Sequence, residues 1–225
     1  MKIGILQTGI AADALITKHG DYPDNFKTFL QNRGFEFEVY EVINNIFPDD
    51  INDCDGWLVT GSRHGAYEKH DWIPPLEKFI CDLYEADIPL IGVCFGHQII
   101  AQALGGIVEK FKGGWTVGRQ VYESDNGNKI KLNAYHQDQV ISAPKCATKI
   151  SGNANCKNAI ITYGQKAFTM QPHPEFSNTY IRELIDARGI GLIDDTILEN
   201  ARNNLIEDLD AKEIANQFEA FYKRA

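Results

Sequence analysis

A cysteine framed by two glycines is the feature of this sequence best suited to chemistry. The segment Gly92-Val93-Cys94-Phe95-Gly96 follows the apolar run "IPLIGV", which is typical of a buried strand, and leads into "HQIIAQALGG", which has the pattern of a helix closed by glycines. A strand that turns sharply into a helix presents one residue at its tip, and the residues two before and two after must be small because the backbones nearly touch. We therefore predict that Cys94 is a nucleophile, with a helix N-terminus that favours its thiolate.

A thiol nucleophile needs a base, and the base needs a group that orients it. His173 stands in "QPHPE" directly after a predicted strand, between Pro172 and Pro174, which cannot continue a helix or a sheet ladder. Glu175 can accept a hydrogen bond from the imidazole and stabilise the imidazolium. The predicted catalytic residues are therefore Cys94, His173 and Glu175.

Other histidines and cysteines are weaker candidates. His136, which Asp138 would orient in "AYHQDQV", stays open as an alternative base, and His97 is expected to line the pocket or pack. The remaining histidines lie in loops without an obvious partner and are predicted to be solvated: His19, His64 and His70. The cysteines without a glycine frame are predicted to be structural: Cys54, Cys81, Cys146 and Cys156. No cluster has the spacing of metal ligands, so we predict neither a metal nor a cofactor.

Composition narrows the class of protein. The chain has 225 residues, of which 44% are hydrophobic, and this predicts a soluble globular domain. The net charge of −9 opposes binding to nucleic acid or to an anionic membrane, because both require clustered Lys and Arg. No apolar run approaches the ~20 residues of a spanning helix. The chain has five cysteines, an odd number, and none of them has CxxC spacing. Because the sequence also shows no apparent export signal, we predict reduced thiols in the cytoplasm.

The elements around these residues predict an α/β fold. Strands "KIGIL", "FEFEVY", "GWLVT" and "IPLIGV" alternate with helices "DNFKTFLQNRG" and "PPLEKFICDLYEA", which indicates a parallel sheet with helices on its faces. The later runs "TVGRQVYE", "NKIKL", "AIITYG" and "KAFTMQ" are predicted to extend the same sheet with antiparallel strands, with a hairpin at Gly164-Gln165. We expect one domain over residues 1–225: a three-layer sandwich around a mainly parallel, flavodoxin-like sheet, with a helical tail over about 177–225.

These segments together resemble the class I (triad) glutamine amidotransferases. "GVCFGHQIIAQALGG" is similar to the nucleophile segment of that family, and "QPHPE" is similar to its His-x-Glu segment. "LVTGSRHG" resembles its oxyanion loop, and "GGWTVGRQ" and "YHQDQV" resemble segments of its stand-alone, GMP-synthase-like branch. The resemblance spans roughly residues 2 to 180.

The resemblance implies a role for each matching residue. Cys94 would attack the side-chain amide of glutamine, or another γ-glutamyl bond, and form a γ-glutamyl thioester. His173 would take the thiol proton and pass it to the leaving amine, while the glutamate orients the histidine. The backbone N–H groups of Gly61 and Phe95 would hold the oxyanion, and Gln98 would help to bind the glutamyl part of the substrate.

Three functions are compatible with these expectations. The first is a stand-alone hydrolase acting on glutamine, a γ-glutamyl peptide or a γ-glutamyl amine. The second is the glutaminase subunit of a two-chain amidotransferase, which would pass ammonia to a synthase partner. The third is a catalytically silent regulatory or binding module. Because no ATP-pyrophosphatase loop is present, a nucleotide product is not implied. Each of the three functions is compatible with a homo-oligomer.

Overall fold

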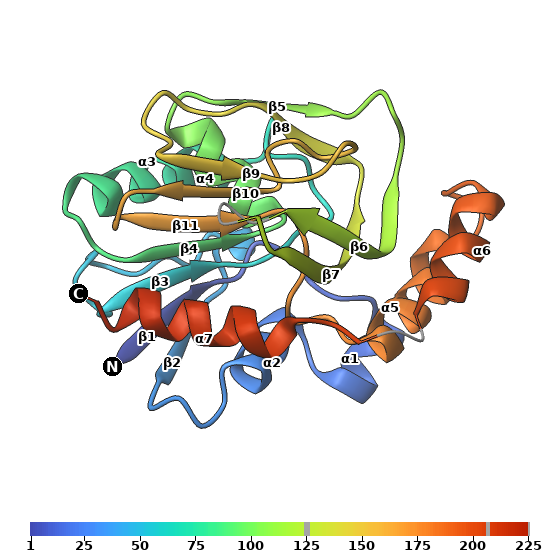
Figure 1. The fold of residues 1–225 in the computed structure, drawn as a ribbon. Helices are drawn as coiled ribbons and strands as arrows, with labels where there is room; N and C mark the ends of the chain where they lie inside the picture. The colour runs from blue at the N-terminus through green and yellow to red at the C-terminus, as the bar shows by residue number, and fades with distance from the viewer. Residues whose placement is uncertain (124–126, 206–207, 225) are drawn as a thin grey trace.

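The computed structural model describes residues 1–123, 127–205 and 208–224, and its centre is a seven-stranded sheet (Figure 1). The strand order is β2-β1-β3-β4-β11-β10-β9. The strands from β2 to β11 pair in parallel, and β10 and β9 follow as antiparallel strands, so the predicted mainly parallel sheet is confirmed. In sheet order the strands span Glu36–Tyr40, Lys2–Leu6, Gly56–Val59, Leu90–Val93, Ala167–Met170, Ile160–Tyr163 and Lys149–Ser151.

Helices cover both faces of the sheet and make the three predicted layers. Helices α2 and α7 pack on one face, and α3 and α4 pack on the other (Figure 1). Alternate residues of a strand point to opposite faces: in β3, Leu58 lies in the core beneath α2 and α7, whereas Trp57 and Val59 lie in the core beneath α3 and α4. The bounds are Tyr22–Phe29 (α2), Ile73–Glu85 (α3), Phe95–Ala103 (α4) and Ala211–Tyr222 (α7).

Two antiparallel pairs lie outside the central sheet, which corrects the prediction that "TVGRQVYE" and "NKIKL" extend it. Strand β6 pairs with β7, and β5 pairs with β8. The β6–β7 pair buries Tyr122, Ile130 and Leu132 in the core beneath α2 and α7, so its apolar side chains cover a face of the sheet instead of pairing with its edge. The bounds are Ile107–Lys110 (β5), Thr116–Glu123 (β6), Lys129–His136 (β7) and Asp138–Ser142 (β8).

Strand β11 enters the sheet beside β4. The predicted hairpin is confirmed, because β10 and β11 pair antiparallel on either side of Gly164, whose φ of 63° favours glycine. The strand then runs parallel to β4, with Met170 opposite Val93, rather than extending the sheet as an antiparallel strand. The carboxyl ends of β4 and β11 therefore lie side by side.

Most of the chain after residue 177 is helical, as predicted for the tail, although residues 206–207 and 225 lie outside the described residues. Helix α5 (Asn178–Leu184) continues into the π-helical turn Ile185–Gly189, and α6 spans Asp195–Asn204. Sequence reasoning missed the short helix α1 (Asp13–His19) and the 3-10 turn Val42–Asn44. None of the helices in the described ranges combines the length and the apolar composition of a membrane span.

We expect Phe218→Ala to lower the free energy of unfolding by about 3–5 kcal/mol, because the Phe218 side chain on α7 is fully buried against the sheet. Urea denaturation followed by circular dichroism measures this loss. Asn216→Ala on the exposed face of the same helix is the matched control and should change stability by less than about 0.5 kcal/mol. Equal losses for the two variants would contradict the packing of α7 on the sheet.

Candidate active site

Three neighbouring parallel strands end at the candidate site. Gly61 follows β3, Cys94 follows β4 and His173 follows β11, and the carboxyl ends of parallel strands meet at one edge of a sheet. A Cβ atom placed on Gly61 would lie 3.0 Å from Cε1 of His173 and 3.8 Å from Cβ of Cys94. The strand order thus brings together three residues that are far apart in the chain.

Cys94 occupies a strained turn between β4 and α4. Its φ of 55° and ψ of −104° place it among the few non-glycine residues with positive φ, and its N–H donates to the carbonyl of Met170 in β11 at 2.8 Å. A Cβ on Gly92 would lie 2.6 Å from the Gly96 carbonyl oxygen, and a Cβ on Gly96 would collide with the carbonyl of Val59. The predicted nucleophile elbow and its need for small flanking residues are confirmed.

The His173 imidazole lies between Glu175 and Cys94. Its Nδ1 is 2.7 Å from Oε1 of Glu175, which leaves Nε2 for the side facing Cys94. Both side chains of the His173–Glu175 pair are almost fully buried. The ring stacks on Phe176 at a centroid distance of 4.0 Å, and its backbone N–H donates to the carbonyl of Asn133 at 2.8 Å, so both the ring and the backbone are held in place.

This environment changes the pKa of His173. Burial by itself lowers it, but the Glu175 carboxylate and the Cys94 sulfur outweigh burial and raise the pKa from 6.5 to about 10. The imidazole therefore holds its proton at neutral pH. A protonated imidazole beside a cysteine is the partner that stabilises a thiolate.

Two backbone N–H groups at the site are free of partners. In the described part of the chain, neither the N–H of Gly61 nor that of Phe95 donates a hydrogen bond, whereas the neighbouring Gly96 N–H donates to the carbonyl of Thr60 at 3.1 Å. Phe95 is the first residue of α4, where N–H groups have no partner within the helix. Both groups lie next to Cys94 and can donate to a negatively charged oxygen.

Gln98 lines the cavity beside Cys94, but its amide group also has a structural partner. Its Nε2 donates to the backbone carbonyl of Asp138 at 2.9 Å and to Oε1 of Gln171 at 3.0 Å. These contacts tie α4 to the start of β8. The predicted contact between Gln98 and a substrate stays a prediction.

His136 and His97 differ from His173. Burial lowers the pKa of both to about 3, so both rings are neutral at pH 7. His136 lines the cavity, and its Nδ1 donates to the backbone carbonyl of Asp138 at 3.2 Å, not to the carboxylate that would orient a base. His97 packs in the core, with Nδ1 2.8 Å from the Thr169 hydroxyl. Of these three histidines, His173 is the one that lies between Cys94 and a buried carboxylate.

The loop after β3 contains a cluster that the sequence did not reveal. His64 and His70, expected to have no partner, lie 3.3 Å and 2.8 Å from Oε2 of Glu68, which corrects that expectation. His19 likewise has a partner, Glu183. The ligating atoms of His64, Glu68 and His70 lie within 4.8 Å of one another, a set that can hold a metal ion. The predicted absence of a metal stays a prediction.

The remaining cysteines lack such an environment. Burial raises the pKa of the thiols of Cys54, Cys81 and Cys156, in the last case to about 12. A thiol with a raised pKa is a poor nucleophile at neutral pH.

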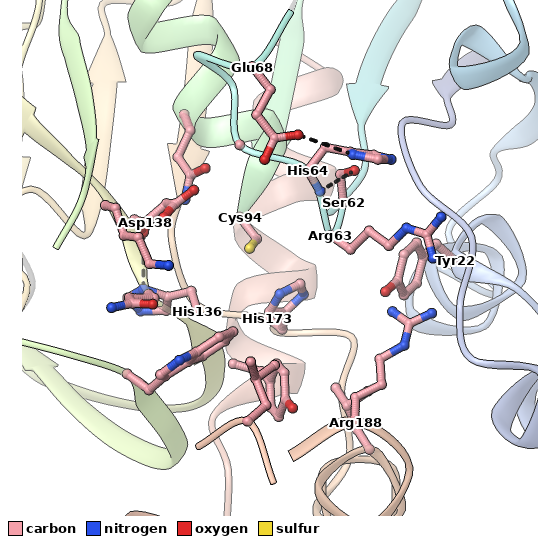
Figure 2. Close-up of a pocket in the computed structure, with 18 of the residues that line it drawn as sticks. Tyr22, Ser62, Arg63, His64, Glu68, Cys94, His136, Asp138, His173 and Arg188 are labelled. Carbon is pink, nitrogen blue, oxygen red and sulfur yellow. Dashed lines mark hydrogen bonds and ion pairs between the residues drawn. The ribbon is translucent and has the colours of Figure 1, made fainter. Parts of the chain in front are cut away.

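A cavity of about 290 Å³ lies beside Cys94 (Figure 2). Its charged lining residues are the cations Arg63, Lys110 and Arg188 and the carboxylates Glu68 and Asp138. Residues 62–65, 67 and 68 of the loop after β3 line this cavity together with Tyr22. Lys110 and Arg188 were missed, because each is a single charge in a segment without a motif.

The layers, the strand order and the elbow are those of α/β proteins built around a sharp strand–helix turn. Residues 19–187 match the family model described as glutamine amidotransferase class-I, and the chain belongs to this family. The resemblance inferred from the sequence is thereby confirmed.

Named relatives and a solved structure agree with this assignment. Gamma-glutamyl peptidase 3 of Arabidopsis thaliana is 29% identical over 185 residues, which are 75% of this chain and 74% of the relative. Gamma-glutamyl peptidase 2 of the same plant is 27% identical over 201 residues, 83% of this chain and 81% of the relative. A crystal structure of a glutamine amido transferase from Methylobacillus flagellatus has the same fold, with a TM-score of 0.75, 20% identity, and coverage of 100% of this chain and 92% of that one.

We expect Gly96→Ala to lower the free energy of unfolding by about 3 kcal/mol, because the new Cβ meets the backbone of Val59, which cannot move aside. Gly34→Ala is the control: its φ is +73°, but its Cβ would meet nothing within 4 Å, so it should cost only the ~1–2 kcal/mol of backbone strain. Chemical denaturation of both variants measures the free energy lost to the steric clash at Gly96 and compares it with the loss from backbone strain at Gly34. A loss at Gly96 no larger than that at Gly34 would contradict the close approach at the elbow.

We expect Glu175→Gln to lower the pKa of His173 by about 1–3 units, because the amide keeps the acceptor oxygen but removes the negative charge. A histidine NMR titration of both proteins measures this change. Since the pKa of His173 in the fold lies above 6.5, the ion pair stabilises the fold fully below pH 6.5 and loses this effect as the pH rises towards 10. The variant should therefore lose stability at pH 6 more than at pH 10. An unchanged His173 pKa would refute this account.

Proposed function

We propose that this chain is a stand-alone cysteine hydrolase that cleaves γ-glutamyl amide bonds, with Cys94, His173 and Glu175 as its catalytic residues. The observation that carries the proposal is the His173 imidazole, which is hydrogen-bonded to a buried carboxylate and faces the elbow cysteine. Membership of the glutamine amidotransferase family and the names of the two peptidase relatives support the choice of a γ-glutamyl substrate.

The proposed reaction has two halves that conserve protons. At neutral pH Nε2 of His173 already carries the proton of the Cys94 thiol, so the sulfur attacks the γ-carbonyl carbon as a thiolate and gives a tetrahedral intermediate. The N–H groups of Gly61 and Phe95 hold its oxyanion, typically worth about 3 kcal/mol per donor. His173 then gives the proton to the leaving nitrogen, the C–N bond breaks, and a γ-glutamyl thioester remains.

Water completes the second half. His173 takes one proton from the water as its oxygen attacks the thioester carbon, and the same two N–H groups hold the new oxyanion. The C–S bond then breaks, glutamate leaves, and the pair of Cys94 thiolate and His173 imidazolium is restored. Glu175 keeps its hydrogen bond to Nδ1 of His173 and stabilises the imidazolium.

The glutamyl head group has a matching set of partners on one side of Cys94. Because Nδ1 of His136 donates to a carbonyl, its Nε2 is an acceptor, and this atom is buried without a partner in the described part of the chain. His136 Nε2 and the Asp138 carboxylate are suited to the α-ammonium group, and Lys110 is suited to the α-carboxylate. All three line the cavity, and Figure 2 draws His136 and Asp138 together beside Cys94.

A second candidate function keeps this chemistry but releases ammonia for a partner. Membership of the glutamine amidotransferase family favours it, because an amidotransferase passes the amide nitrogen of glutamine to an acceptor. The two functions differ in the leaving group: a dedicated hydrolase turns over γ-glutamyl peptides or amines well above glutamine, whereas a glutaminase subunit turns over glutamine slowly until its synthase is added.

We expect Cys94→Ala to abolish glutamate release from every γ-glutamyl compound, because no other group can form the thioester. The assay measures glutamate from glutamine, γ-glutamyl dipeptides and γ-glutamyl amines. Cys146→Ala, at a half-buried cysteine outside the cavity, is the matched control and should retain full activity. Undiminished release by Cys94→Ala would rule out the proposed function.

A further inference from the structure

The cavity carries more positive charge than a γ-glutamyl head group requires. It is lined by three cations and two carboxylates, in a chain whose net charge is −9. One of those carboxylates, Glu68, is already hydrogen-bonded to His64 and His70. Lys110 and Asp138 match the two charges of the glutamyl head, so Arg63 and Arg188 remain for another group.

These two arginines lie together, away from the glutamyl side. Figure 2 shows Arg63 and Arg188 beside Tyr22, on the opposite side of Cys94 from His136 and Asp138. A γ-glutamyl substrate whose carbonyl sits at Cys94 and whose head group sits near Asp138 directs its leaving amine towards the arginines. The side of the cavity that receives the leaving group is therefore cationic.

Neither arginine is neutralised by the protein. Within residues 1–123, 127–205 and 208–224, no carboxylate forms an ion pair with Arg63 or Arg188, and Asp186, close to Arg188 in the chain, pairs with Arg202 instead. Arg188 is nevertheless held in position, because its Nη2 donates to the carbonyl of Ile10 at 3.1 Å. Arg188 also hydrogen-bonds the Tyr22 hydroxyl, and because a guanidinium has five donors, it keeps further N–H groups for a ligand.

Nearby hydroxyl groups offer further hydrogen bonds. Tyr22 and Tyr135 line the same cavity, and the Tyr135 hydroxyl is buried without a partner in the described part of the chain. Burial raises the pKa of both phenols to about 12, so each keeps its proton and can donate it. Guanidinium and hydroxyl donors both form charge-assisted hydrogen bonds to a carboxylate, and a guanidinium can donate two at once.

We propose that Arg63 and Arg188 bind a carboxylate carried by the leaving amine, so that the preferred substrates are γ-glutamyl amino acids. This inference rests on the proposed function and narrows its substrate class. A γ-glutamyl amino acid carries two carboxylates and one ammonium group, which matches the three cations and the Asp138 carboxylate. Glutamine and simple γ-glutamyl amines lack the second carboxylate and leave the two arginines unused.

The test compares γ-glutamylglycine with γ-glutamylglycinamide, in which an uncharged amide of similar size replaces the carboxylate of the leaving group. Wild-type protein should show a kcat/KM at least tenfold higher for the acid, the size expected for a charge-assisted hydrogen bond. Arg63→Gln and Arg188→Gln should each bring this ratio down towards one, mainly by raising KM for the acid. Arg182→Gln, at an exposed arginine outside the cavity, is the matched control and should keep the wild-type ratio.

Two results would overturn the inference while leaving the proposed function intact: a wild-type ratio near one, or a high ratio that neither cavity arginine affects. Binding to Cys94→Ala, measured by calorimetry with the same two compounds, gives a readout that does not depend on turnover. The acid should bind at least tenfold more tightly than the amide, and Arg188→Gln in that background should remove the difference. Turnover of neither compound by wild-type protein would instead count against the hydrolase itself.

Discussion

The close approach of α4 to the ends of β3 and β4 is the constraint on which the site depends. Gly92 and Gly96 have no side chain because the Gly96 backbone passes directly over Val59 and Gly92. This contact forces Cys94 into a positive-φ conformation and leaves the N–H of Phe95 without a partner. The strained turn therefore places Cys94 at the cavity, next to a backbone donor that can stabilise negative charge.

The charges of the site are arranged around this turn in order of burial. The His173–Glu175 pair lies deepest, where removal from water strengthens its electrostatic attraction and keeps the imidazole protonated. His136, equally buried but without a carboxylate, is neutral. Arg63 lies in the loop after β3 and Arg188 in the π-helical turn after α5, on the other side of Cys94 from His136 and Asp138. A protonated histidine, a neutral histidine and two permanently charged arginines therefore lie around the same edge of the sheet.

Features encoded within a few neighbouring residues could be predicted from the sequence, whereas features that depend on contacts between distant segments could not. The elbow, the alternating strands and "QPHPE" are each encoded within a few residues, so Cys94 and the His173–Glu175 pair could be recognised together. The β6–β7 pair could not be separated from the central sheet, because an alternating pattern does not tell whether a strand pairs with an edge or covers a face. The partners of His64 and His70 and the placing of Arg188 depend on how loops fold in space, which no spacing encodes.

The insertion of β11 beside β4 also decides when the cysteine acquires its partner. During synthesis the chain completes the β4–α4 turn well before β11 and the segment that carries His173 emerge. Until β11 joins the sheet, the Cys94 N–H lacks the Met170 carbonyl, and the thiol has neither an imidazole nor a buried carboxylate near it. A nascent or partly folded chain therefore holds Cys94 without these partners, which gather around the sulfur only after the last central strand is in place.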